Sequence, residues 1–161
     1  MAHKRAEIEV WGTVLFVDAA GTDGIDEGAL QVGIDKVREF ALHVDDVFST
    51  YKLDSVISNL RRREISIESA SEEVKDVWNL CAYAREITEG AFDPWAVAGG
   101  FDPSGLVKGW AADICAEIML ESGAKHVQIN AAGDLSLRGG HFDGQEVAPW
   151  SVGVVNPEIR E

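Results

Sequence analysis

The stretch of residues 102–113, Asp-Pro-Ser-Gly-Leu-Val-Lys-Gly-Trp-Ala-Ala-Asp, leads from a glycine-rich loop into a helix that we predict over residues 107–122. A helix N-terminus presents unpaired N–H groups and the positive end of the helix dipole. Lys108 in the first turn would add a full positive charge, which suits a phosphate. Taken alone, this spacing is better explained by a turn at Asp102 and a surface charge at Lys108.

A long amphipathic helix is the strongest periodic signal before this stretch. Six apolar residues recur three or four positions apart: Leu30, Ile34, Val37, Ala41, Val44 and Phe48. The pattern predicts a helix over residues 27–47. Residues 7–17 are rich in β-formers and predict one opening strand, whereas the glycines and aspartates of residues 18–28 predict a loop.

A second amphipathic helix is predicted in the middle of the chain, after a short helical turn at residues 55–60. Ser69-Ala-Ser-Glu72 resembles a capping box, and Gly90 is suitably placed to end the helix. Its inward positions are Val74, Val77, Cys81 and Ala84. Two Phe-Asp-Pro units then follow in residues 90–109, and the many glycines there favour a loop whose backbone can approach a ligand closely.

The C-terminal third predicts three strands at hairpin spacing, over residues 126–130, 135–138 and 150–155, with Asn156-Pro157 ending the last. Turns are expected at residues 131–134 and 139–145. The order of elements predicts an α+β fold, with helices packed on a mostly antiparallel sheet. The absence of a linker or repeat favours a single domain over residues 1–161.

Composition excludes several classes of protein. The chain has 28 acidic and 14 basic side chains, a formal charge of −14, which opposes binding to nucleic acid or to an anionic membrane. No apolar run approaches the length of a membrane span and the N-terminus is polar, so we expect a cytoplasmic protein. Cys81 and Cys115 form no CxxC motif and are expected to be buried, reduced thiols.

Three further segments are candidate ligand sites. Phe92 and Asp93 could flank and hydrogen-bond an aromatic ring, Tyr51 just past a helix end could stack and offer a hydroxyl, and residues 130–134 form a tight turn. On local pattern alone, a turn or a core aromatic residue explains each segment better than a ligand site does. The GxGxxG and GxxxxGK[ST] fingerprints of nucleotide sites are absent, and no histidine pair has metal-ligand spacing.

Five motifs in order resemble the FAD:protein FMN transferase family, the ApbE family. They are Trp11-Gly-Thr, Phe48-Ser-Thr-Tyr-Lys-Leu-Asp-Ser, Gly90-Ala-Phe-Asp-Pro, residues 102–113, and Val127-Gln-Ile-Asn-Ala-Ala-Gly-Asp134. Each motif alone is weak, but their order and spacing from Glu9 to about Pro157 are specific. The resemblance implies an ApbE-like, T-fold-related domain.

The family resemblance also implies chemistry. Members bind FAD and Mg²⁺ and transfer FMN to a threonine hydroxyl of a flavin-accepting redox protein, which carries an acceptor motif, with release of AMP. The positions that match FAD contacts are Trp11 (in place of the family's methionine), Tyr51, Ala91, Phe92, Asp93, Asp102 and Lys108. Gly105 matches the position whose backbone carbonyl binds the metal, and the family's remaining metal-site residues have no match before Glu161.

Two departures from the family keep alternatives open. The segment between Asp93 and Asp102 is short, and the family's C-terminal half has no counterpart in this sequence. The chain is therefore expected to be either a fragment of a longer transferase or a short form. A non-catalytic FAD-binding module is the alternative function, and a homo-oligomer is a further open alternative.

Overall fold

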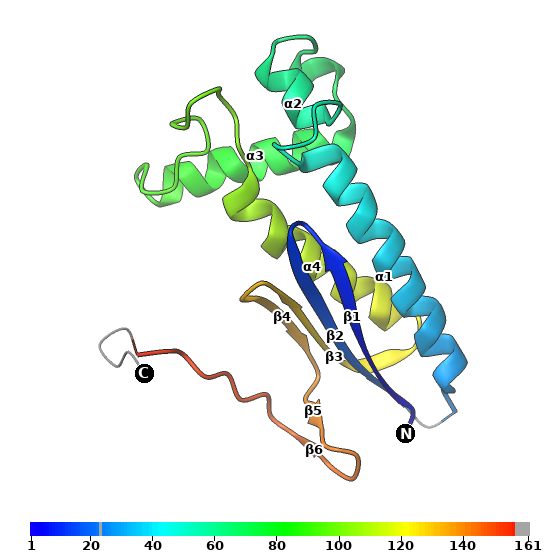
Figure 1. The fold of residues 1–161 in the computed structure, drawn as a ribbon. Coiled ribbons are helices and arrows are strands. Elements are labelled where there is room, and N and C mark those ends of the chain that lie inside the picture. The colour runs from blue at the N-terminus through cyan, green and yellow to red at the C-terminus, as the bar shows by residue number, and fades with distance from the viewer. Residues whose placement is uncertain (23, 157–161) are drawn as a thin grey trace.

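A four-stranded antiparallel sheet forms the base of the molecule in the computed structural model, which describes residues 1–22 and 24–156. The strands follow the spatial order β1-β2-β3-β4, and helices α1 and α4 lie side by side across one face of the sheet (Figure 1). The predicted α+β fold is confirmed. The bounds are β1 His3–Val10, β2 Thr13–Gly21, α1 Glu27–Phe48, α4 Ser104–Glu121, β3 Ala124–Ala131 and β4 Asp134–Arg138.

The single opening strand predicted over residues 7–17 is wrong, because β1 and β2 form a hairpin. Trp11 and Gly12 make its two-residue turn, with φ of +57° and +69°. Positive φ at both positions is the geometry of a type I′ turn, whose twist matches that of the flanking strands. The predicted loop over residues 18–28 is correspondingly shorter, since β2 continues through Gly21 and pairs with β3.

One hydrophobic core lies between the sheet and the two long helices. Ile8, Leu15 and Ile129 are fully buried and belong to the core that the sheet forms with α1 and α4. The predicted apolar face of α1 is confirmed, because all six of its residues are buried. Gly33 allows α1 to cross α4 closely, since a Cβ there would lie 2.8 Å from the Cβ of Ser122.

A second core lies at the other end of α1 and α4 and is built by α2 (Val56–Arg61), η1 (Ile67–Ser69) and α3 (Glu72–Ile87). The short helical turn and the second helix are confirmed, although Ala84 is only half-buried. The predicted capping box is wrong: Ser71 is the N-cap of α3, and the Ser69 hydroxyl instead donates to the carbonyl of Ser66. Gly90 follows the helix end with φ of +83°.

The strand predicted over residues 150–155 is also wrong within the described residues. A small hairpin forms earlier, from β5 (His141–Phe142) and β6 (Val147–Ala148), and residues 149–156 pair in no sheet. Val154 and Val155 are 91% and 84% exposed. Pro157 and Glu161 lie outside the described residues.

The helix predicted over residues 107–122 is present but begins three residues earlier, at Ser104. Among the described residues, none of the helices has the length and apolar character needed to cross a bilayer.

Candidate functional site

A cleft of about 500 Å³ opens where three segments meet: the β1–β2 turn, the end of α1 with the loop after it, and the first turns of α4. Its size is typical of small-molecule sites. Apolar side chains alternate with polar ones around it. The lining residues are Trp11, Gly12, Val44, Asp45, Phe48, Ser49, Thr50, Tyr51, Lys52, Ser104, Val107 and Lys108.

The Trp11 ring is held in place by a long-range hydrogen bond. Its indole Nε1 donates to the carbonyl oxygen of Ala41 on α1, at 3.0 Å. This bond fixes a non-glycine residue in the left-handed region, which L side chains rarely occupy. The ring therefore forms a fixed wall between the hairpin turn and α1.

Tyr51 lies in the loop after α1, lines the same cleft as Trp11 and is 95% exposed. The Ser49 hydroxyl accepts from the backbone N–H groups of Tyr51 and Lys52, at 3.2 and 3.3 Å. These bonds shape the turn that presents the phenol to solvent. An aromatic ring that packs against so little of its own protein is available to a planar ligand.

Lys52 and Lys108 are the two cations of the cleft, and their surroundings differ. The Lys52 ammonium pairs with Asp45 and Asp46, and hydrogen bonds to these carboxylates raise its pKa. Lys108 has no ion pair or hydrogen bond to any described residue. Its side chain is half-buried in the second turn of α4 and is free to meet an anion.

Asp102 lies beside the cleft rather than in its wall. One carboxylate oxygen accepts from the backbone N–H of Ser104 at 2.9 Å and from the Ser104 hydroxyl, so it is hydrogen-bonded to the first residue of α4. The other oxygen is 3.8 Å from a guanidinium nitrogen of Arg61. Ser104 connects Asp102 to the cleft, because its own side chain lines it.

The segment of residues 91–93 contacts the same helix start but does not line the cleft. The Phe92 ring packs on Gly105, where a Cβ would lie 3.0 Å from it. Asp93 pairs with Arg85 at 2.9 Å and accepts from the backbone N–H of Trp95, while Ala91 is exposed. A backbone bond of 2.8 Å from Asp102 to Pro94 ties the two Phe-Asp-Pro units together.

The structure therefore gathers Trp11, Tyr51 and Lys108 in one cleft and places Asp102 next to it. Sequence reasoning missed Ser104, because the predicted helix began too late. The turn at residues 130–134 serves the fold: Asn130 accepts from the backbone N–H of Gly133 at 2.8 Å, between β3 and β4. The buried state expected of both cysteines is confirmed.

Few side chains of the described residues are arranged to bind a metal ion. In residues 1–22 and 24–156, no group of three or more His, Cys, Asp or Glu side chains is arranged to hold a metal ion. Gly105 lies in the first turn of α4, next to the residue that is hydrogen-bonded to Asp102. The Asp102 carboxylate at this helix start already accepts from Ser104 with one oxygen and approaches Arg61 with the other.

Comparison with known proteins agrees with the fold and with the motifs. The model of the ApbE family matches residues 96–161. A curated FAD:protein FMN transferase of Vibrio cholerae serotype O1 is 23% identical over 93% of this chain. The match covers 58% of that relative, so the chain spans little more than half of its length.

Solved structures of flavin transferases share this fold. The flavin transferase ApbE of Vibrio cholerae superposes with a TM-score of 0.74 and 22% identity, over 96% of this chain and 65% of that one. The apo flavinyl transferase ApbE of Pseudomonas stutzeri gives 0.80 and 15%, over 98% and 63%. The ApbE protein of Thermotoga maritima gives 0.78 and 18%, over 97% and 64%. The family model, a curated relative and solved structures thus confirm the resemblance of this chain to the FAD:protein FMN transferase family, the ApbE family.

Proposed function

We propose that the cleft binds FAD, and that residues 1–161 form a single ApbE-like domain of a flavin transferase. The reaction would move FMN from FAD to a threonine hydroxyl of an acceptor redox protein and release AMP. The observation that supports this most is the position of Lys108, an unpaired cation that shares one cleft with the aromatic rings of Trp11 and Tyr51.

The cleft suits each part of a flavin dinucleotide. A diphosphate needs a positive charge, which Lys108 supplies near the positive end of the α4 dipole. The planar rings need aromatic or apolar walls, which Trp11, Tyr51 and Val107 supply. Lys52 remains outside this arrangement, because its charge is already neutralised by the carboxylates of Asp45 and Asp46.

The roles proposed for the remaining predicted residues follow from their positions. Phe92 packs under Gly105 and so keeps the first turn of α4 in place, and Asp93 anchors the loop before it. Asp102 and the Gly105 carbonyl would hold Mg²⁺. Bound there, the ion would neutralise charge that develops on the diphosphate during transfer. Lys108 would orient the same diphosphate for attack by the acceptor hydroxyl.

Flavin binding is tested by titrating the protein into FAD and following flavin fluorescence. We expect saturable quenching by the wild-type protein and, for Lys108→Ala, a Kd raised about tenfold or more because a charge-assisted contact is lost. Lys125→Ala is the matched control, since Lys125 is an exposed lysine on β3 and does not line the cleft. Equal quenching by wild type and Lys108→Ala would refute the proposal.

Transfer is tested separately, because the chain spans 58% of the curated relative. FAD binding without catalysis is the alternative function. Incubation with FAD, Mg²⁺ and a threonine-containing acceptor peptide should yield a peptide heavier by FMN, together with AMP. Quenching without either product would assign the chain to the binding function instead.

A further inference from the structure

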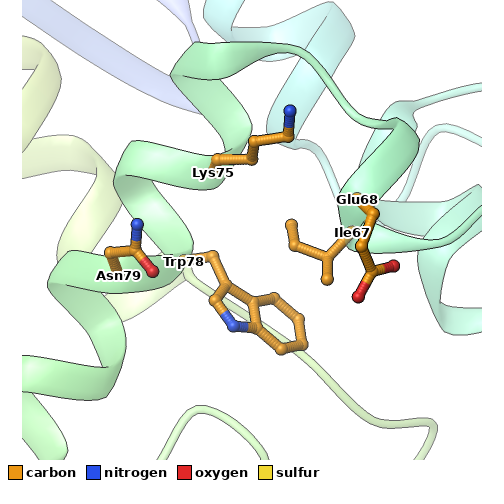
Figure 2. Close-up of a pocket in the computed structure, with 5 residues that line it drawn as sticks. All are labelled: Ile67, Glu68, Lys75, Trp78 and Asn79. Atoms are coloured by element: carbon orange, nitrogen blue, oxygen red, sulfur yellow. The ribbon is translucent and has the colours of Figure 1, made fainter.

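A furrow that crosses Trp78 lies apart from the flavin cleft. One of its ends is a cavity of about 480 Å³ between α2, α3 and the loop of residues 95–101. The other end is a cavity of about 410 Å³ lined by Ile67, Glu68, Lys75, Trp78 and Asn79. Ile67 and Trp78 line both cavities, so the two form one continuous Trp78 furrow, whose second end is shown in Figure 2.

The floor of the Trp78 furrow is rigid and aromatic. Trp78 packs against Trp95 and Phe101 with ring centroids 5.0 and 4.5 Å apart, and Trp95 and Phe101 are themselves 5.3 Å apart. Phe101 is buried, whereas both indoles stay half-exposed. Such partly exposed, preorganised indoles are typical of the anchoring positions of protein interfaces.

One rim of the Trp78 furrow carries a positive charge, on Arg63, that forms no ion pair with a described residue. Arg61 is occupied by the carbonyl of Ala98 at 2.7 Å, and Arg62 by Glu64 at 2.8 Å. Arg63 is exposed and lines the furrow, and its guanidinium has no hydrogen bond or ion pair to a described residue. The chain as a whole carries −14, so this basic edge is opposite in sign to most of the surface.

The backbone holds Arg63 at this rim at a cost in strain. Arg63 adopts φ of +61° just after the end of α2, a place where glycine is the usual residue. The strain does not serve to bury the side chain, which remains in solvent. An arginine is thus kept where glycine would fit the backbone better.

We propose that the Trp78 furrow docks an extended peptide segment of a partner protein, with an apolar side chain against Trp78 and Ile67 and a carboxylate at Arg63. Two cavities on either side of one ring suit an extended chain, whose alternate side chains point the same way. The carboxylate follows from charge complementarity at this rim, where the Arg63 guanidinium is exposed and has no described partner, whereas Glu68 lies at the other end of the furrow. This proposal goes beyond flavin binding and does not require it.

A short series of side-chain contacts connects the furrow to the flavin cleft. Arg61 lines the furrow and approaches Asp102, and Asp102 accepts two hydrogen bonds from Ser104, which lines the cleft. A partner docked in the furrow would therefore lie next to the proposed flavin site. Within the proposed function, the acceptor protein is the partner with a reason to be held there.

The experiment selects a phage-displayed library of random twelve-residue peptides on the wild-type protein without FAD. We expect the enriched sequences to share an acidic residue within three positions of a large apolar one. The best synthetic peptide should then bind about tenfold or more weakly to Arg63→Gly, measured by fluorescence anisotropy. Arg63→Gly relieves the left-handed backbone, so misfolding would not account for the loss.

Two matched controls make the result specific. Arg62→Ala removes the neighbouring arginine and should leave the peptide Kd unchanged, and a peptide with its acidic residue replaced by lysine should bind Arg63→Glu better than wild type. Enrichment of no common sequence, or equal binding by wild type and Arg63→Gly, would overturn the proposal. Peptide binding without FAD quenching would refute the flavin function alone, so the two failures are distinguishable.

Discussion

The indole of Trp11 and the backbone carbonyl of Ala41 are joined by a hydrogen bond of 3.0 Å, which ties the β1–β2 turn to the middle of α1. We expect Trp11→Phe to lower the free energy of unfolding by about 1 kcal/mol, because the hydrogen bond is lost while the ring remains. Urea denaturation would measure this change. FAD affinity should stay within about twofold of wild type, since a planar wall is kept.

Trp11→Ala is the companion variant, because it removes the ring as well as the bond. It should weaken FAD binding as well as stability. If both variants bound FAD like the wild type, the ring would have no part in the site and the cleft would lose one of its three proposed contacts.

Much of the fold could be predicted because local pattern and tertiary packing agree along α1. The six apolar residues of that helix are spaced for one face, and the sheet requires one buried face. The hairpin could not be predicted in the same way, because Trp11 is a poor turn residue by type. Its positive φ depends on a bond to Ala41, thirty residues away.

The candidate site was predictable to the extent that its residues lie in recognisable motifs. Tyr51 and Lys108 were found by motif, and the structure brings them to one cleft. Asp93 pairs with Arg85, and Asp102 accepts a hydrogen bond from Ser104. Residue spacing in the sequence does not predict these tertiary and local contacts. Residues 150–155 include β-forming residue types, which favour a strand, but no described strand pairs with them.

The two buried thiols predict a loss of stability at alkaline pH. Burial raises the pKa of Cys81 and of Cys115 to about 12, from an ordinary value of 9.0. Between these values the unfolded chain ionises its thiols and the folded chain does not. The stabilisation is therefore complete below pH 9 and is lost as the pH rises toward 12, by on the order of 1 kcal/mol for each thiol at pH 10.

The measurement is the free energy of unfolding at pH 8 and at pH 10, for wild type and for Cys115→Ala. The variant should lose on the order of 1 kcal/mol less than the wild type over this interval, because one titrating thiol is gone. Lysine and tyrosine titration is common to both proteins and cancels in the difference. Identical losses would show that Cys115 is not shielded from ionisation. Native protein should also resist thiol reagents until it is unfolded.

Variants at Asp93 distinguish a structural role of this side chain from a ligand-binding role. It accepts a hydrogen bond from the Trp95 N–H and pairs with Arg85, whose side chain is 55% exposed. We expect Arg85→Ala to cost no more than about 1 kcal/mol and to leave FAD affinity unchanged, because exposed ion pairs contribute little. Asp93→Ala should cost about 1–2 kcal/mol, since a backbone N–H in the loop loses its acceptor.

Asp93→Asn is the matched control, since an amide oxygen can still accept from Trp95. If Asp93→Asn kept full stability and yet lost FAD affinity, the carboxylate charge would act on the ligand directly. If it kept both, the role of Asp93 would be confined to shaping the loop. Thermal unfolding and FAD titration on the same samples distinguish these outcomes.

We expect a substitution in the extended segment of residues 149–156 to change the solubility of the protein but not its free energy of unfolding. Val154 packs against almost nothing and is 91% exposed, whereas Val127 on β3 is fully buried. Val154→Lys should therefore change the free energy of unfolding by less than about 0.5 kcal/mol, while Val127→Ala should cost about 2 kcal/mol. Exposed apolar strands without paired backbone promote association between chains, and a lysine opposes it. Light scattering at increasing concentration should therefore show less aggregation for Val154→Lys than for wild type. A large loss of stability in Val154→Lys would instead mean that this segment packs against the rest of the protein in solution.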